Sequence, residues 1–231
     1  MKSRKIDFSI IIPAYNEEKT IGQIVAAVKK VKYPGTFEII VINDCSKDST
    51  QEKIDKIAGI TKIWNNKNRG KGYCLRSGFS KAKGEIILIQ DADLEYDPND
   101  HLKLISEIKN SGTDVIYGSR FLNPNHKPKY LLFYAGNLFL SFLTKILYRA
   151  QITDMETCYK CFKSEVLKGI KLREDRFGFE PEITCKLLKK GLKIVEIPIA
   201  YKSRSYQEGK KIGIKDGFRA IYILLKYRFA S

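Results

Sequence analysis

Residues 86–95 of the chain read IILIQDADLE, four apolar residues followed directly by a polar, acidic segment. A short apolar run rich in β-branched residues is typical of a strand that is buried on both faces. Apolar runs that end in polar residues also occur at 8–12 and 38–42. We therefore expect several parallel strands whose carboxyl ends place polar side chains at one edge of a sheet.

Segments with helical periodicity separate these runs. Residues 19–31, for example, carry apolar side chains at a spacing of three and four residues. The expected strands are 8–12, 38–42, 61–64, 85–89 and 114–117, and the expected helices are 19–31, 49–57, 72–82 and one that starts at Asp97-Pro98 and ends at Lys109. This alternation predicts an α/β fold with a doubly wound, mostly parallel sheet and helices on both faces.

The second half of the chain is less regular. We expect helices at 130–148, 180–190 and 214–227, and strands at 157–162 and 193–199. The last helix is predicted to present one apolar face, made of Ile214, Phe218, Ile221, Leu224 and Leu225. The sequence therefore predicts one domain at 1–213 and a basic amphipathic helix at 214–231 that is part of it or packed on it.

The charge balance narrows the choice of partners. Of 231 residues, 42 are Lys or Arg and 26 are Asp or Glu, which gives a formal net charge of +16 and suggests an anionic partner. No GxGxxG or GxxxxGK[ST] motif is present, so a dehydrogenase or a P-loop kinase is not expected. No nucleic-acid-binding signature is present either, and we expect no nucleic-acid partner.

The N-terminus and the cysteines indicate the compartment. The stretch MKSRKIDFS lacks the apolar core of a secretion signal. Five scattered cysteines indicate reduced thiols in a cytosolic protein. Cys158 and Cys161 form a CxxC, but with no second pair and no nearby histidine, ordinary thiols are favoured over a zinc site.

Three polar clusters follow the expected strands at 12–18, 43–50 and 91–95. Asp91 and Asp93 are two residues apart, so both carboxylates can reach one hard cation such as Mg²⁺ or Mn²⁺, although a bare DxD also occurs in solvated acidic turns. Asp44 is expected to contact a ligand, whereas Asp48 and Ser49 are expected to cap a helix. Together the clusters predict a crevice large enough for a nucleotide.

The chain resembles the family 2 glycosyltransferases with the GT-A fold. Within this family it is most similar in its motifs to the dolichol-phosphate mannosyltransferase and dolichol-phosphate glucosyltransferase branch. The matching stretches extend from residue 10 to residue 213: IIPAYNEE, VINDCSKDST, NRGKGYCLRSGF, QDADLEYDP, YGSRF, ITDMETCYKCF, FGFEPEI and RSYQEGKKIG.

The resemblance implies roles for the matching residues. It places a donor site at Pro13, Ala14, Tyr15, Glu17, Asp44, Gly70, Asp91, Ala92 and Asp93, with Asp44 on the base or ribose. It implies that Asp91 and Asp93 hold the metal and the diphosphate, with Glu95 as a further metal ligand. The resemblance also implies that three basic side chains bind phosphate groups: Arg120, Arg204 and Lys211. Lys210 could take the place of Lys211. Guanidinium and ammonium groups are well suited to bind phosphate.

The implied reaction is the inverting transfer of a hexose from GDP-mannose or UDP-glucose to a polyprenyl phosphate. An already ionised phosphate needs no base. The alternative acceptor is a sugar hydroxyl, as in polysaccharide or glycolipid synthesis, which would require a base such as Glu180, Glu182 or Asp154.

The charge map favours the phosphate acceptor. Residues 115–153 contain no acidic side chain, and residues 202–231 contain eight basic and two acidic ones. The apolar stretch at 130–144 is shorter than the roughly 20 residues of a membrane span. We expect peripheral association with the cytoplasmic face of a membrane, or a separate membrane-anchoring subunit, because the chain ends at Ser231 without spans. The alternative is that both helices pack on the core or on a second subunit.

Overall fold

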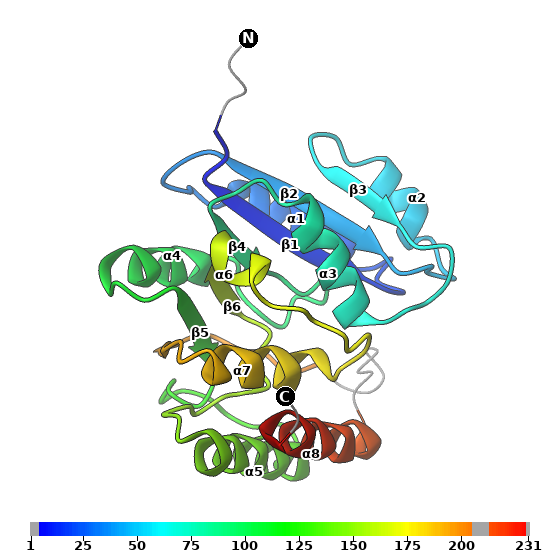
Figure 1. The fold of residues 1–231 in the computed structure, drawn as a ribbon. Helices are drawn as coiled ribbons and strands as arrows, with labels where there is room; N and C mark the ends of the chain where they lie inside the picture. Colours follow the sequence, from blue (N-terminus) through cyan, green and yellow to red (C-terminus); the bar gives the residue numbers. More distant parts are fainter. Residues whose placement is uncertain (1–4, 205–212, 230–231) are drawn as a thin grey trace.

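The computed structural model describes residues 5–204 and 213–229, and it shows an α/β fold. A seven-stranded sheet has the order β3-β2-β1-β4-β6-β5-β7 (Figure 1). Its strands are β1 (Phe8–Ala14), β2 (Phe37–Asn43), β3 (Thr61–Trp64), β4 (Ile86–Ile89), β5 (Val115–Ser119), β6 (Lys160–Lys163) and β7 (Ile194–Pro198). The strands are parallel except β6, which runs antiparallel to both β4 and β5. The predicted mostly parallel sheet is confirmed.

Helices cover both faces of this sheet. They are α1 (Ile21–Lys30), α2 (Thr50–Asp55), α3 (Lys71–Lys81), α4 (Asp100–Asn110), α5 (Leu131–Tyr148), α6 (Ser164–Lys168), α7 (Phe179–Lys189) and α8 (Ile214–Phe229). Side chains alternate along β1: Ile10 packs in a core with α1, α2 and α4, and Ile11 packs in a second core with α3, α5, α7 and α8. The doubly wound arrangement is therefore confirmed.

The register of the strands aligns the ends that carry the polar clusters. Ala14 at the end of β1 pairs with Asn43 at the end of β2, and Ile11 pairs with Ile89 at the end of β4. The helix after β2 is capped as expected by Asp48, whose Oδ1 accepts from the backbone N–H of Thr50 at 3.0 Å. The Ser49 hydroxyl makes no such bond.

Two predicted boundaries were wrong. Helix α4 begins at Asp100 instead of Pro98, because Asp97 and Pro98 form a turn before it, in which Asp97 Oδ1 accepts from the N–H of Asn99 at 2.9 Å. The strand expected at 157–162 is reduced to Lys160–Lys163. The Lys160 ammonium donates to the carbonyl oxygens of Met155 and Thr157 and so supports a loop in front of the strand. The short helix α6 was not predicted.

The apolar face expected on the last helix was also only partly right. Helix α8 buries Ala220, Ile223, Leu224 and Tyr227, whereas Phe218 is 70% exposed. Leu225 is also exposed, and the side chain of Ile214 lies outside the described residues. The face is rotated because α8 packs between two helices: Tyr148 of α5 donates to the carbonyl of Leu224, and Tyr227 donates to Glu182 of α7.

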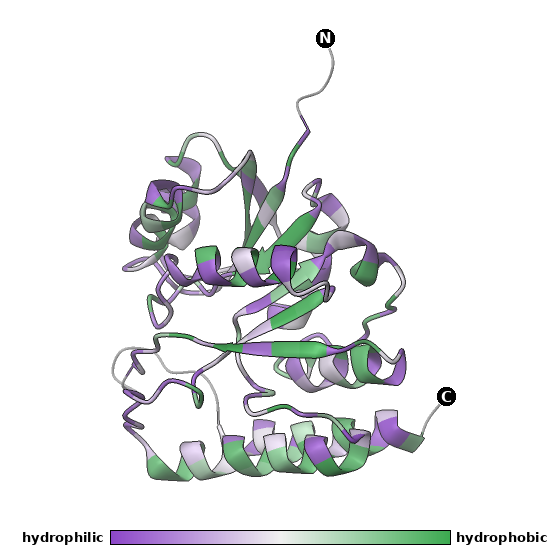
Figure 2. Ribbon diagram, turned by 90° about the vertical axis from the view of Figure 1, so that its left-hand side faces the viewer, coloured by the Kyte–Doolittle hydropathy of each residue, from purple (hydrophilic) through white to green (hydrophobic). Residues whose placement is uncertain are grey.

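Helix α5 confirms the helix predicted at 130–148, and its 18 residues extend beyond the apolar stretch at 130–144. Of the described part of the chain, this one helix is long and apolar enough to cross a membrane, and only 17% of it is buried. Figure 2 shows apolar residues along the pair of helices α5 and α8 at the bottom of the molecule. Their exposed large apolar side chains are Leu131, Leu132, Leu138, Phe139, Phe142, Ile146, Phe218, Tyr222, Leu225 and Phe229, which we call the α5–α8 face.

Candidate active site

A pocket of about 330 Å³ lies at the carboxyl ends of β1, β2 and β4. It gathers twelve of the residues that the sequence singled out: Pro13, Ala14, Tyr15, Glu17, Asp44, Gly70, Asp91, Ala92, Asp93, Glu95, Arg120 and Arg204. Lys210 and Lys211 lie outside the described residues. The wall is completed by residues to which sequence reasoning gave no donor role, among them Lys71, Tyr96, Glu156, Cys158, Arg176, Phe177, Glu180 and Tyr201.

The acidic segment after β4 turns sharply at the pocket. Gln90 continues the sheet, because its N–H donates to the carbonyl of Ile11 at 2.9 Å. Leu94 has a φ of 64°, in the left-handed region, and this conformation reverses the chain. Asp93 Oδ1 accepts from the N–H of Glu95 at 3.1 Å. The turn thus places three carboxyl side chains on the pocket wall.

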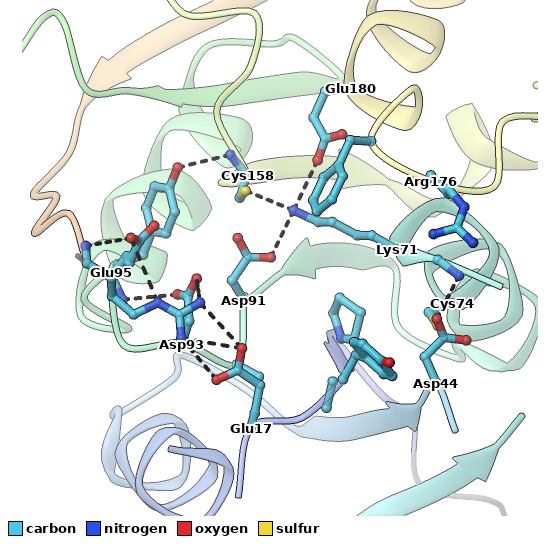
Figure 3. Close-up of a pocket in the computed structure, with 18 of the residues that line it drawn as sticks. Glu17, Asp44, Lys71, Cys74, Asp91, Asp93, Glu95, Cys158, Arg176 and Glu180 are labelled. Carbon is cyan, nitrogen blue, oxygen red and sulfur yellow. Dashed lines mark hydrogen bonds and ion pairs between the residues drawn. The ribbon is translucent and has the colours of Figure 1, made fainter. Parts of the chain in front are cut away.

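Asp91 is paired with a lysine that opens α3. The Lys71 ammonium lies 2.9 Å from Asp91 Oδ1, 3.0 Å from Glu180 Oε1 and 2.8 Å from Cys158 Sγ (Figure 3). Burial opposes ionisation of Asp91, but the Lys71 charge, hydrogen bonds from Cys158 and Lys71 and the Arg204 charge together outweigh it and hold the pKa of Asp91 below its usual value. Burial and the Asp91 charge raise the pKa of Cys158 well above that of a free thiol, so the thiol stays protonated.

Arg204 lies among three other carboxylates. Its guanidinium is 3.0 Å from Asp93 Oδ2, 3.1 Å from Glu17 Oε2 and 3.9 Å from Glu95 Oε1. Burial, followed by the charges of Asp91 and Glu95, raises the pKa of Asp93 to about 7. The Arg204 charge acts in the opposite direction and favours the ionised form of Asp93.

These contacts bear on the predicted metal site. No group of three His, Cys, Asp or Glu side chains is arranged to hold an ion within residues 5–204 and 213–229. The three-carboxylate arrangement predicted at Asp91, Asp93 and Glu95 is thus not assembled, because Glu95 accepts instead from the Tyr201 hydroxyl at 2.9 Å and from the Arg204 N–H at 2.7 Å. Asp91 and Asp93 are hard oxygen ligands that face the pocket, which fits a divalent ion completed by phosphate oxygens.

Asp44 lines the pocket but already organises a loop. Its Oδ1 accepts from Asn65 Nδ2 at 2.7 Å and from the N–H of Arg69 at 2.9 Å, and its Oδ2 accepts from the N–H of Gly70 at 2.6 Å. Gly70 has a φ of 97°, and a Cβ there would lie 2.6 Å from the carbonyl oxygen of Asp175. By accepting these hydrogen bonds, Asp44 keeps the loop that contains Gly70 close to the segment that carries Arg176.

Arg120 is fixed by a buried, bidentate ion pair. Its Nε and Nη2 donate to the two carboxyl oxygens of Asp154 at 2.7 and 2.6 Å. This pair removes Asp154 from the candidate bases, and Asp154 does not line the pocket. Glu182 is likewise turned away, toward Tyr227 and Lys186. Of the three bases considered, Glu180 alone lines the pocket, and it is paired with Lys71.

Carboxylates and cations at the strand ends of such a sheet are suited to bind a nucleoside diphosphate, and the fold is that of the GT-A glycosyltransferases. The structure of glucosyl-3-phosphoglycerate synthase from Mycobacterium tuberculosis, crystallised with Mn²⁺, UDP and phosphoglyceric acid, superposes with a TM-score of 0.72. The match covers 99% of this chain and 80% of that one at 17% identity, and it shows the shared fold.

The chain belongs to glycosyl transferase family 2, whose model matches residues 9–170. It is therefore a glycosyltransferase. It is 31% identical to the UDP-N-acetylglucosamine–dolichyl-phosphate N-acetylglucosaminyltransferase of Methanococcus voltae, over 96% of each chain. It is 29% identical to the dolichol-phosphate mannosyltransferase of Pyrococcus furiosus, over 95% of this chain and 64% of that protein. The resemblance found in the sequence is confirmed.

Proposed function

We propose that this glycosyltransferase moves a hexose, mannose or glucose, from GDP-mannose or UDP-glucose to a polyprenyl phosphate, with inversion at the anomeric carbon. The observation that carries the choice of acceptor is the state of the candidate bases. Asp154 is held by Arg120, Glu182 faces α8, and Glu180 is paired with Lys71. A hydroxyl acceptor needs a base to take its proton, whereas a phosphate acceptor is already ionised.

The pocket also supplies the positive charge that two phosphate-bearing substrates need. Lys71, Arg120, Arg176 and Arg204 all line it. Guanidinium and ammonium groups attract phosphate oxygens, and several of them in one pocket can stabilise a diphosphate and an acceptor phosphate together. Relatives named as dolichyl-phosphate sugar transferases support the same acceptor class.

We assign the donor nucleoside to the wall made by Pro13, Ala14, Tyr15, Asp44 and Gly70, and the diphosphate to Asp91, Ala92 and Asp93. Asp91 and Asp93 would hold Mg²⁺ or Mn²⁺, and the bound ion would neutralise charge on the departing diphosphate. Arg204 and Lys211 are proposed to add positive charge at the same place. The residues of the pocket then act mainly by positioning the two substrates and stabilising the leaving group.

The α5–α8 face is proposed to rest on the cytoplasmic face of a membrane. Its exposed apolar side chains are accompanied by exposed basic residues on the same two helices, among them Lys145, Lys215 and Arg228. An apolar surface bordered by positive charge is attracted to anionic lipid by roughly 1 kcal/mol per basic residue. We favour a surface position over a span for α5, because this helix packs along α8 (Figure 1).

A transfer assay tests the proposed reaction. Purified protein with Mn²⁺ and radiolabelled GDP-mannose or UDP-glucose is given either a short polyprenyl phosphate or the matching polyprenol, and lipid is extracted into organic solvent. We expect label in the extract with the phosphate and none with the alcohol. The double variant Asp91→Asn plus Asp93→Asn should lose the label, and Asp114→Asn, whose carboxyl forms an exposed pair with Lys163, should keep it. Label on added sugar acceptors alone would contradict the phosphate acceptor.

A further inference from the structure

Two carboxyl groups of the pocket wall have oxygen atoms without a hydrogen-bond partner. Among the buried polar side-chain atoms of the described residues, Glu156 Oε1 and Glu180 Oε2 make no hydrogen bond, and both side chains line the pocket. A buried oxygen without a partner is costly, and the cost is larger for a carboxylate. A ligand that donates hydrogen bonds to both oxygens in this cavity would remove that cost and be stabilised in return.

These two groups lie apart from the residues assigned to the nucleoside. Glu180 comes from the first turn of α7, and Glu156 from the loop before β6. In Figure 3 Glu180 lies above Asp91, beside Cys158, whereas Asp44 lies below and to the right. Lys71 contacts both Glu180 and Asp91 and so links the two carboxyl groups. Glu180 is thus linked through Lys71 to the residue assigned to the diphosphate and lies apart from Asp44, and its charge acts on Glu156.

The chemistry of the two groups suits hydroxyls. Burial, followed by the charge of Glu180, raises the pKa of Glu156 to about 8, so at neutral pH Glu156 is mainly a carboxylic acid that can both donate and accept. Glu180, paired with the Lys71 ammonium, offers an acceptor oxygen. Phe177 also lines the pocket, and an aromatic ring is a surface on which a sugar ring can pack.

We propose that Glu156 and Glu180 form the subsite for the sugar of the donor, each binding a hydroxyl group, and that this subsite selects a neutral hexose over a uronic acid. The inference rests on the proposed function, whose donor must place its sugar next to the diphosphate. A uronic acid would bring its own carboxylate next to that of Glu180, and like charges at this range oppose each other.

Binding measurements separate this role from a structural one. Isothermal titration with Mn²⁺ compares UDP-glucose with UDP, and GDP-mannose with GDP. Glu156→Met removes both polar atoms at similar length and should weaken binding of the nucleotide hexose about tenfold, while binding of the nucleoside diphosphate changes less than twofold. Glu156→Gln retains a donor and an acceptor and should restore most of the loss.

Glu180→Gln tests the selection against acidic sugars. The wild type should bind UDP-glucose in preference to UDP-glucuronic acid, and this preference should fall about fivefold or more in Glu180→Gln. Glu174→Gln is the matched control. Its carboxyl is also buried, but it pairs with Arg219 outside the pocket, so it should leave all of these affinities unchanged.

The outcomes distinguish two failures. If the wild type binds neither nucleoside diphosphates nor nucleotide sugars, the proposed function itself fails. If the wild type binds them, the sugar subsite is refuted by either of two results: Glu156→Met weakens both ligand types equally, or it weakens neither.

Discussion

Each aspartate of the DxD segment is paired with a different basic side chain: Asp91 with Lys71, and Asp93 with Arg204. The two cations come from opposite parts of the sequence, since Lys71 opens α3 and Arg204 follows β7. A divalent ion that binds both carboxylates must replace at least one of these contacts. The Arg204 side chain is the more exposed of the two, 16% against 12% for Lys71, so we expect Arg204 to be the one displaced.

Replacing Arg204 should therefore separate metal binding from turnover. Arg204→Ala removes the cation that competes for Asp93 and should strengthen Mn²⁺ binding in the absence of nucleotide, by about tenfold, since the pair lost is partly buried. The same change should lower transfer to the lipid about a hundredfold, because a phosphate contact is lost. Electron paramagnetic resonance titration of Mn²⁺ measures the first effect. Arg219→Ala is the control, and weaker metal binding by Arg204→Ala would refute the competition.

Glu156 makes the stability of the protein depend on pH. Its pKa is about 8 in the folded protein, against an ordinary value of 4.5, so between these values the folded state binds more protons than the unfolded one. Its contribution to stability is fully present below pH 4.5 and is lost as the pH rises toward 8. Glu156→Gln cannot ionise, so its melting temperature should exceed that of the wild type by several degrees at pH 9 and by less at pH 6. An equal difference at both values of pH would contradict this assignment.

The sequence predicted the acidic half of the pocket better than the basic half. Asp91 and Asp93 follow a β-branched run, and this local pattern is enough to place them at a strand end. Lys71 forms its contacts with Cys158, 87 positions away, and nothing near Lys71 in the sequence indicates that partner. Glu156 was missed for the same reason, because its surroundings come from α7 and β6.

Helix α3 lies directly on the sheet at Gly78. A Cβ there would lie 2.4 Å from Ile11 Cγ2 of β1, and α3 carries no other glycine at that contact. Gly78→Ala should therefore lower the free energy of unfolding by about 1–3 kcal/mol through overpacking. Gly22→Ala, on α1 with nothing within 4 Å of its Cβ, should instead raise it by about 0.5–1 kcal/mol. Urea denaturation of the two variants checks the difference in sign.

Elements were predictable where local sequence determines them. The strand at Thr61–Trp64 was located to the residue, and the bounds of the other parallel strands differ by one or two residues. Two predictions failed: the length of β6 and the apolar face of α8. In both places contacts with residues distant in the sequence determine the structure. Tyr148 and Glu182 set the orientation of α8, and both lie far from it in the sequence.

At the scale of the whole molecule, the α5–α8 face gives the protein one side suited to lipid. Phe139→Asp plus Phe142→Asp places two charges among exposed apolar residues that are 52% and 58% accessible, so the fold should tolerate them. We expect this variant to sediment with vesicles of anionic phospholipid at least fivefold less than the wild type. Trp64→Asp, on the edge strand β3, is the control and should sediment as the wild type does. Undiminished sedimentation of the double variant would exclude this face as the lipid contact.

The antiparallel strand β6 also has a consequence for how the chain is made. It lies between β4 and β5, yet its residues are synthesised after both (Figure 1). While the ribosome has made only the first 150 residues or so, β4 has an open edge, and β5 has no neighbour to join it to the sheet. The nascent chain therefore leaves the backbone of residues 86–89 unpaired on one side until residue 163 has left the exit tunnel, and an open strand edge of this kind can pair with another chain.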